Sequence, residues 1–469
     1  MDDVLVTGAT GFIGERLAHD LLDEGYRVRV LARTPSKAAA LAERGAEIVE
    51  GDVTDLESVR AAMDGVDGVF HLAAIYELGA DPDQMRAVNV GGTENVLDAA
   101  SEAGVSRVVY CGSDTSLGNT RGAVCDESKT HDGSFRSVYE LTKHKAHQLV
   151  EERIEAGEPI VNAIVSTVYG PGDESPIAEL IRYHLAGHAV AHLDRNAGYT
   201  FAHVDDVATG LRLAYERGDV GERYLLSGTP ASFETLFGVL SRQTGIPAPR
   251  FELPSEIVDR LAPFVERGAA LLGKRPAEVR EMIAMGRGVT RYFSSKKARR
   301  ELDWEPRPLE EGLRDTLPWF YEREREASDA LLEATRAPLG ALAVFDVGLG
   351  ATAVFLPDLY NRLMHPRRGR GRRDAPDYLL ARTGTQWLFF SAVQGVAALQ
   401  PAERPGWVLG AGVLRLLDVP ADLVYLLRSD DQGLLGKLGL ASAPIFNLAT
   451  GALLVYAGYR GLRARRGQK

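Results

Sequence analysis

Tyr139 and Lys143 are well suited to acid–base chemistry because they stand four positions apart in the segment YELTK. That spacing places two side chains on one face of a helix, and residues 138–156 carry apolar residues at helical spacing. An unperturbed tyrosine, with a pKa of about 10, is a slow proton donor at neutral pH. We expect the charged lysine to favour the phenolate and to lower the pKa of Tyr139 toward neutrality.

Ser113 supplies the third group that reduction of a carbonyl would need. It follows the apolar run 107–111, in the segment CGSDTS. Open parallel sheets place their sites at the carboxyl ends of strands, so this hydroxyl could hydrogen-bond a carbonyl oxygen and stabilise its developing charge. We therefore expect Ser113, Tyr139 and Lys143 to be the catalytic residues. A tyrosine–lysine pair at this spacing is common by chance, so the prediction depends on the elements around it.

The elements that position these residues follow a strand–helix–strand rhythm. Short β-branched runs alternate with helix-length segments, which predicts an α/β fold with a doubly wound parallel sheet. The pattern loosens after residue 170, where we expect a smaller substrate lobe. A charged helical segment followed by Pro338 places the end of this domain near residue 330. The predicted strands are 4–7, 27–32, 47–50, 68–73, 107–111 and 160–165.

The segment TGATGFIG, residues 7–14, follows the first predicted strand and opens a predicted helix. Glycines at this spacing make a tight turn, admit a pyrophosphate close to the backbone and let the helix pack on the strand. The sequence therefore predicts a Rossmann-type dinucleotide site, with hydride transfer from a nicotinamide. The predicted contacts in this loop are Gly8, Thr10, Gly11, Phe12, Ile13 and Gly14.

The second predicted strand ends in Ala32 and Arg33, where an acidic residue would bind the ribose 2′-hydroxyl of NAD. Arg33, with Lys37 nearby, can instead pair with a 2′-phosphate, so we expect NADP in preference to NAD. The alternative is that Arg33 is a solvated charge at a strand end. Asp52 is expected at the adenine edge. The remaining predicted cofactor contacts are Val53, Leu72, Ala73, Ala74, Tyr139, Lys143 and Val168.

Taken together, these motifs resemble the extended short-chain dehydrogenase/reductases, and most of all the dihydroflavonol-4-reductase-like and hopanoid-associated sugar-epimerase group. The resemblance covers residues 3–320 and implies an NAD(P)-dependent oxidoreductase of the epimerase/dehydratase superfamily. Besides the glycine loop and the three catalytic residues, it rests on GDVTD (51–55), FHLAAIY (70–76), NVGGTENVLDAA (from Asn89), VYGPGD (168–173) and HVDDVA (203–208).

Two departures from the family pattern narrow the substrate. Ser166 and Thr167 stand where the family often has Arg-Pro, which argues against a nucleotide sugar. Asp114 and Thr115 follow Ser113 without the glutamate of the dehydratase branch. We expect a carbonyl or secondary alcohol on a small lipophilic molecule. An NAD-retaining sugar epimerase and a non-catalytic dinucleotide-binding sensor or assembly subunit are the alternatives.

Four further residues have two interpretations each. His203, beside two aspartates, is expected to organise a turn and not to act in catalysis, and Cys111 is expected to be a strand residue and not a reactive thiol. Tyr76 and Tyr169 could line the substrate pocket or pack as ordinary aromatic residues.

The composition excludes several classes of function. A formal net charge of −11 argues against a nucleic-acid-binding surface. Cys111 and Cys125 are the two cysteines, and their spacing fits neither a disulfide framework nor a metal site, so no metal is expected. The first strand begins at Val4, which leaves no room for a signal peptide, so the enzyme domain is expected in the cytoplasm. A homodimer is compatible with the sequence.

Residues 331–469 differ in character from the rest of the chain. Four apolar stretches, rich in Gly and Ala, approach the roughly 20 residues that cross a bilayer. We predict an all-α membrane module that contacts lipid through residues 339–459 and weakly resembles DoxX-like four-helix proteins. The stretches are Leu339 to Pro357, Leu379 to Leu399, Trp407 to Leu427 and Leu434 to Tyr459.

Charged residues within these stretches leave a soluble helical bundle as the alternative. Arg415 could pair with Asp418 or Asp422 inside a bundle. Four spans would also place the basic run 367–373 outside, against the positive-inside tendency, and the basic tail 460–469 inside. The interrupting residues are Asp346, Arg382, Arg415, Asp418 and Asp422.

Overall fold

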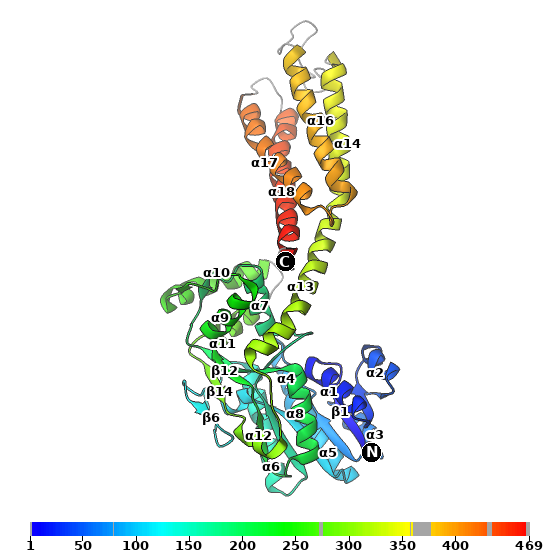
Figure 1. Cartoon of the computed structure of the whole chain (residues 1–469), viewed down its shortest axis with the longest axis vertical. Helices are drawn as coiled ribbons and strands as arrows, with labels where there is room; N and C mark the ends of the chain where they lie inside the picture. Colours follow the sequence, from blue (N-terminus) through cyan, green and yellow to red (C-terminus); the bar gives the residue numbers. More distant parts are fainter. Residues whose placement is uncertain are drawn as a thin grey trace. The chain divides into compact units, whose positions relative to one another are not determined.

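A computed structural model describes residues 2–77, 79–271, 275–356, 358–359, 377–428 and 434–465, so the basic run 367–373 lies outside the described residues. The chain divides into two compact units, Met1–Leu317 and Pro318–Lys469 (Figure 1). The boundary expected near residue 330 falls inside helix α13, Leu309–Ala334, which the two units share.

The first unit is built on a seven-stranded parallel sheet with the strand order β11-β7-β5-β4-β1-β2-β3. The order reverses beside β1, which makes the carboxyl ends of β1 and β4 the switch point where such sheets bind ligands. All six predicted strands are present, and the Rossmann prediction is confirmed. The strands are β1 Asp3–Thr7, β2 Arg27–Ala32, β3 Glu47–Glu50, β4 Gly68–His71, β5 Arg107–Ser113, β7 Ile160–Val165 and β11 Arg223–Leu226.

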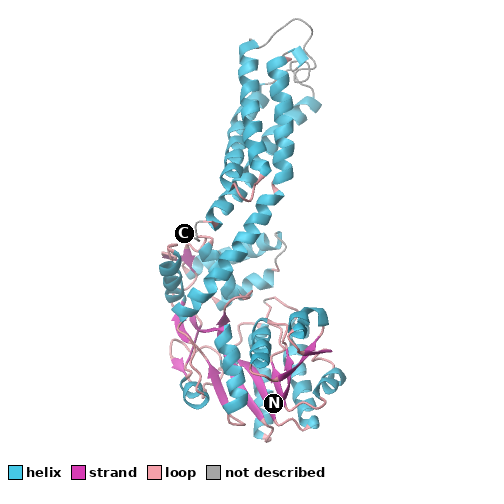
Figure 2. Ribbon diagram, turned by 45° about the vertical axis from the view of Figure 1, so that its right-hand side comes forward, coloured by secondary structure: helices cyan, strands magenta, loops and turns pink. Residues whose placement is uncertain are grey.

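Helices cover both faces of this sheet, as Figure 2 shows. Alternate strand residues point to opposite faces, so Val4 and Val6 join the core beneath α1 and α8 while Leu5 joins the core beneath α3, α5 and α6. The helices are α1 Phe12–Asp23, α2 Ala39–Glu43, α3 Leu56–Met63, α4 Pro82–Arg86, α5 Gly92–Ala103, α6 Val138–Glu155 and α8 Val204–Arg217, with a π-helical turn at Ala87–Gly91 and 3-10 turns at Pro35–Ala38 and Asp114–Leu117.

The substrate lobe contains a second sheet, in which β10 lies between β12 and β14 and also pairs with β8. The chain beyond residue 170 does not stay in this lobe, because α8 and β11 return to the first sheet. The strands are β6 Val124–Cys125, β8 Thr167–Tyr169, β9 Ala191–His192, β10 Gly198–His203, β12 Thr229–Ser232, β13 Phe251–Glu252 and β14 Thr290–Phe293; the helices are α7 Pro176–Leu185, α9 Phe233–Thr244, α10 Ser255–Leu271, α11 Pro276–Met285 and α12 Lys296–Leu302.

The second unit is helical. Its long helices coincide with the four apolar stretches of the sequence: α14 Arg336–Phe355, α16 Asp377–Leu399, α17 Pro405–Arg428 and α18 Leu434–Ala464. Glycines bring them close together: a Cβ on Gly350 would lie 2.8 Å from the carbonyl oxygen of Gly384, and one on Gly412 would lie 2.8 Å from that of Gly451. These helices therefore pack backbone against backbone.

A polar cluster lies inside this helical unit. Arg415 donates hydrogen bonds to Asp346 Oδ2 at 2.5 Å and to Gln394 Oε1 at 3.3 Å, and its other terminal nitrogen lies 3.4 Å from Asn447 Oδ1. Asp346 and Gln394 are fully buried. The sequence suggested aspartates on Arg415's own helix as its partners, whereas this ion pair joins α17 to α14; the side chain of Asp422 lies outside the described residues.

Apolar side chains face outward from the same helices. Val344 and Phe355 are 74% and 73% exposed, and each of α14, α16, α17 and α18 carries further exposed large apolar residues. Among the described residues, one continuous run is long and apolar enough to cross a membrane, the 309–355 run formed by α13 and α14. The unit thus buries a polar cluster in addition to an apolar core, and it exposes large apolar side chains on its surface.

Candidate active site

A cavity of about 850 Å³ opens at the carboxyl ends of β1, β4 and β5. It brings together every site residue predicted from the sequence, although the role of each stays a prediction. These residues are Gly8, Thr10, Gly11, Phe12, Ile13, Gly14, Arg33, Lys37, Asp52, Val53, Leu72, Ala73, Ala74, Ser113, Tyr139, Lys143 and Val168.

The glycine loop has the shape that a pyrophosphate requires. Gly8 has a φ of +76°, and a Cβ there would lie 2.7 Å from the amide nitrogen of Ala73. A Cβ on Gly14 would collide with the Gly8 carbonyl, so only glycine lets α1 begin this close to the loop. Gly11 is the N-cap of α1 and offers no side chain to the free N–H groups of the first turn. The residues present therefore fit a dinucleotide.

Arg33 and Lys37 line the far end of the cavity as exposed side chains. Within the described part of the chain, neither forms an ion pair, so both are available to an anionic group. Asp52 already uses Oδ1 to accept two hydrogen bonds from Thr54, each 2.9 Å long. This carboxylate therefore shapes the turn after β3 as well as lining the cavity.

Ser113, Tyr139 and Lys143 meet at the centre of the cavity. Ser137 caps α6 by accepting a hydrogen bond from Glu140 N at 3.1 Å, which sets Tyr139 in the first turn of the helix. The Tyr139 ring packs edge-on against Tyr76 at 4.7 Å, and the Ser113 hydroxyl lies 2.9 Å from that of Thr115. Lys143 Nζ donates to Tyr110 Oη and to the Cys111 carbonyl, each at 3.1 Å.

The pKa of Tyr139 is set by opposing effects. Burial raises the pKa above its ordinary value, while the charge of Lys143 and the hydrogen bond with Ser113 lower it. The net direction is upward, so the expected lowering by Lys143 exists but is outweighed by loss of hydration. Burial alone would lower the pKa of Lys143, but Tyr110 and Tyr139 raise it, and the amine therefore stays charged.

Buried polar side chains fix the strands and loops beneath this centre. His71 bridges Thr7 Oγ1 at 2.8 Å and Thr93 Oγ1 at 3.0 Å, and burial lowers its pKa to about 3. Asn89 accepts a hydrogen bond from Ile75 N at 2.7 Å and donates to the Ile75 carbonyl at 3.2 Å. The loop after β4 is thereby held against the π-helical turn Ala87–Gly91, and Asn89 also donates to Thr142 Oγ1 of α6 at 3.1 Å.

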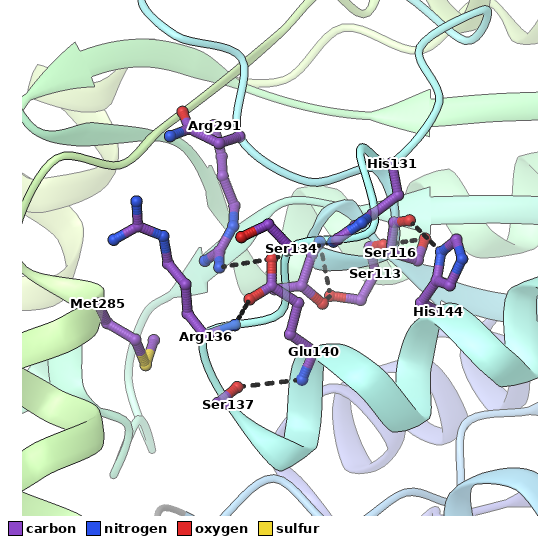
Figure 3. Close-up of polar contacts among 12 residues, drawn as sticks. Ser113, Ser116, His131, Ser134, Arg136, Ser137, Glu140, His144, Met285 and Arg291 are labelled. Atoms are coloured by element: carbon purple, nitrogen blue, oxygen red, sulfur yellow. Dashed lines mark hydrogen bonds and ion pairs between the residues drawn. The ribbon is translucent and has the colours of Figure 1, made fainter.

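A buried cluster of charged side chains beside the cavity has no signal in the sequence. Glu140 accepts a hydrogen bond from Arg136 N at 2.8 Å, contacts His131 Nε2 at 3.3 Å and lies 3.9 Å from Arg291 (Figure 3). Arg291 and Asp114 are both buried and line the cavity. Asp114 adjoins Ser113, but Arg291 arrives on β14 of the second sheet, a contact that no local motif signals.

The two ambiguous tyrosines have different positions. Tyr76 lines the cavity, whereas Tyr169 is 1% exposed and packs edge-on against His203 at 5.6 Å. His203 caps α8 through a hydrogen bond from Asp205 N, in agreement with its predicted turn-organising role. Cys111 is a β5 residue, and burial raises the pKa of its thiol to about 11.

Apolar side chains line much of the cavity in the lobe, together with some polar ones. The apolar residues include Ile177, Leu180, Leu193, Phe233, Phe237 and Met285, and the polar ones include Glu179, His188, His192 and Asp194.

Known proteins with similar sequences identify the family to which this chain belongs. The model of the NAD dependent epimerase/dehydratase family matches residues 4–227. A putative dihydroflavonol 4-reductase from Synechocystis is 32% identical over 68% of this chain and 94% of its own. The chain belongs to this family. With reductases and dehydrogenases among its relatives, it is a short-chain dehydrogenase/reductase enzyme, an oxidoreductase that uses NAD(P).

Two further relatives have names that describe enzymes acting on steroids or sterols. A 3 beta-hydroxysteroid dehydrogenase/Delta 5-->4-isomerase from Mycobacterium tuberculosis is 32% identical over 71% of this chain and 95% of its own. Sterol demethylase protein B from Methylococcus capsulatus is 32% identical over 68% and 98%, respectively. These alignments include most of each relative but about two thirds of this chain.

Solved structures also correspond to about two thirds of this chain. The crystal structure of gox2253 superposes with a TM-score of 0.59 and 37% identity, and covers 69% of this chain and 99% of its own. MoeE5 in complex with UDP-glucuronic acid and NAD gives a TM-score of 0.54 at 26% identity, over 68% and 99%. A whole relative thus corresponds to about two thirds of this chain, the share that the compact unit Met1–Leu317 occupies, so we expect residues 1–330 to fold without the helical unit.

The buried carboxyl group of Asp114 should make the free energy of unfolding depend on pH. Burial raises its pKa to about 7, against the attraction of Arg291 and a hydrogen bond from Ser166. Between the ordinary value of 3.8 and about 7, the native protein keeps a proton that the unfolded chain has lost. The stability contributed by Asp114 therefore falls as pH rises through this window and is constant above it.

Asp114→Asn keeps the shape of the side chain without its ionisation. Between pH 5 and pH 8, the free energy of unfolding of wild-type residues 1–330 should fall by about 2 kcal/mol relative to that of Asp114→Asn. Urea unfolding at each pH measures this difference. Asp83→Asn, at an exposed carboxylate on α4, is the control and should gain nothing with pH. If the free energy of unfolding changed with pH in the same way for wild type and Asp114→Asn, the raised pKa of Asp114 would be contradicted.

Proposed function

We propose that this enzyme reduces a carbonyl, or oxidises the corresponding secondary alcohol, on a small lipophilic molecule. The observation that carries the proposal is the position of Ser113, Tyr139 and Lys143 between the glycine loop and the apolar part of one cavity. The steroid dehydrogenase and sterol demethylase relatives support a lipophilic substrate. Ser166, whose hydroxyl is 2.7 Å from that of Ser227, offers no cation to a nucleotide sugar.

Each of these residues has its own role in the proposed reaction. When bound by the glycine loop, the nicotinamide dinucleotide supplies or accepts the hydride at the carbonyl carbon. Ser113 and Tyr139 hold the substrate oxygen, and the Tyr139 hydroxyl gives it a proton as negative charge develops. Lys143 stays charged at its two hydrogen bonds and stabilises the phenolate that remains on Tyr139.

Loss of the Tyr139 hydroxyl tests this assignment. For Tyr139→Phe in residues 1–330, we expect turnover of NADPH with a panel of apolar ketones to fall about 10²–10⁴-fold, because the general acid is gone. Tyr169→Phe removes a buried hydroxyl outside the cavity and is the matched control, with turnover close to wild type. Undiminished turnover in Tyr139→Phe would refute the catalytic role, and tight dinucleotide binding without turnover in wild type would favour the epimerase or the sensor.

We further propose that NADP is preferred to NAD. Arg33 and Lys37 are exposed cavity residues that form no ion pair within the described residues, so a 2′-phosphate would meet two available cations. The first residue after β2 is thus basic where a carboxylate would suit the ribose hydroxyl of NAD.

Arg33→Gln tests the preference directly. We expect the KM for NADPH to rise at least about 10-fold and the KM for NADH to stay within about 2-fold, because only the phosphate loses a charged partner. Arg44→Gln removes another exposed arginine, one that pairs with Asp23 outside the cavity, and should change neither KM. Equal KM values of wild type for the two cofactors would rule out the role of Arg33.

The helical unit is proposed to lie in a lipid bilayer. Its helices bury the polar residues Asp346, Gln394 and Arg415 beside an apolar core and expose many large apolar side chains, which is unusual for a soluble bundle. Close helix contacts at glycines are also typical of membrane helices.

Extraction of membranes tests this placement. We expect the full chain to stay with the bilayer in alkaline carbonate and to be released by detergent, because its apolar exterior needs lipid or detergent around it. Residues 1–330, expressed in the same cells, should stay in the supernatant. Release of the full chain by carbonate alone would show that the module does not cross the bilayer.

A further inference from the structure

Helix α10 presents an apolar face to solvent on the outer side of the substrate lobe (Figure 1). Large apolar residues recur along it at positions i, i+4, i+7 and i+8, which lie on one face of a helix. Single exposed apolar residues are common, but a continuous row of them marks a binding surface. We call this row the apolar edge; it consists of Phe251, Leu253, Ile257, Leu261, Phe264 and Val265, which are between 36% and 70% exposed.

The charged residues of α10 are distributed unevenly around the helix. Asp259 and Glu266 form ion pairs, 2.7 and 2.8 Å long, with arginines just after and on α11. Their spacing places both carboxylates opposite the apolar face. Arg260 and Arg267 are exposed and lie along one border of that face, where Glu256 offsets one of the two charges. An apolar face with a basic border is typical of helices that lie in the interface of an anionic membrane.

A lipid bilayer is also the partner that the rest of the chain would bring close. Helix α13 is shared by the catalytic unit and the helical unit, so a bilayer that holds the second keeps the first at its surface. A single interfacial helix binds membranes weakly by itself, but such a tether raises the effective concentration of lipid around it. Weak docking of this kind agrees with the release of residues 1–330 that we expect in carbonate.

The apolar edge is connected to the wall of the cavity. Strand β13, which holds Phe251, pairs with β9, Ala191–His192, and both β9 residues line the cavity. Leu253 N donates a hydrogen bond to the His192 carbonyl at 2.9 Å. Helix α10 also packs against α11, whose last residue, Met285, lines the cavity. Lipid bound at the apolar edge would therefore be one element away from the cavity.

We propose that the apolar edge is a lipid-docking surface of the catalytic unit and that it enters the interface of the bilayer that holds the helical unit. This inference rests on the proposed bilayer placement and adds a second, separate membrane contact. It places the wall of the cavity beside the phase in which a lipophilic substrate is dissolved. The substrate can then enter the cavity from the bilayer.

Quenching of a fluorescent label by lipid tests the surface. Phe264→Cys and Val220→Cys of the full chain are labelled with NBD and reconstituted in phosphatidylcholine–phosphatidylglycerol vesicles that contain doxyl-labelled lipid. Val220, an exposed apolar residue between α8 and β11, is the matched control. We expect quenching at position 264 to be about 3-fold stronger than at position 220 or more, because only the first label reaches the lipid. Wild type labelled in parallel corrects for the two native cysteines.

A second substitution tests whether the apolar face itself causes the quenching. Leu261→Glu in the labelled Phe264→Cys chain should lower the quenching to that at position 220, because a carboxylate is unfavourable in the interface. Leu261→Phe should keep it. Position 261 is half exposed, so neither change disturbs the core.

The outcomes separate this inference from the proposals on which it rests. Equal quenching at the two positions in vesicles that hold the full chain would overturn the docking surface alone. A label at position 264 that iodide cannot reach and lipid does not quench would overturn it as well, because protein would then cover the apolar edge. A full chain that does not float with vesicles would refute both the bilayer placement and the docking surface. No turnover is measured, so the result is independent of the proposed reduction.

Discussion

The parallel register of β1, β4 and β5 is the constraint on which the site depends. It places Thr7 opposite His71 and His71 opposite Tyr110, one line of residues across the sheet just below the loops. His71 joins Thr7 to Thr93 through its two ring nitrogens, and burial lowers its pKa to about 3. Tyr110 in turn accepts a hydrogen bond from Lys143. A shift of one strand by one residue would turn this row to the other face and separate the catalytic groups.

Local patterns made the first sheet and the glycine loop predictable. Six strands were foreseen because each is a short β-branched run, and the loop because its glycines follow the first of them. β11 was missed, since its four residues RYLL carry no distinctive signal. Tyr139 and Lys143 were predicted from their helical spacing, and Ser113 from its place at a strand end. The fold brings this helix and this strand end to the same edge of the sheet.

Contacts between distant segments could not be predicted in the same way. Arg291 and Glu140 are about 150 positions apart and meet because β14 joins a second sheet beside the cavity. The same limit applies to Arg415, whose ion-pair partner Asp346 lies on another helix. The net upward direction of the Tyr139 pKa also depends on burial, which spacing alone does not reveal. Sequence patterns thus predicted groups that a single element positions, and missed those that only tertiary packing brings together.

The path of the chain through the lobe has a consequence for how specificity can change. Residues 204–226 leave the lobe to form α8 and β11 on the first sheet, and the chain then enters the lobe again at β12. The walls that meet the substrate therefore come from two separate insertions, one on each side of an element that completes the dinucleotide-binding sheet. Exchange of one insertion by recombination would pair half of a new pocket with half of the old one. Substrate range in such an architecture changes by substitutions within the walls, while the edge strand between them holds the two halves in one cooperative unit.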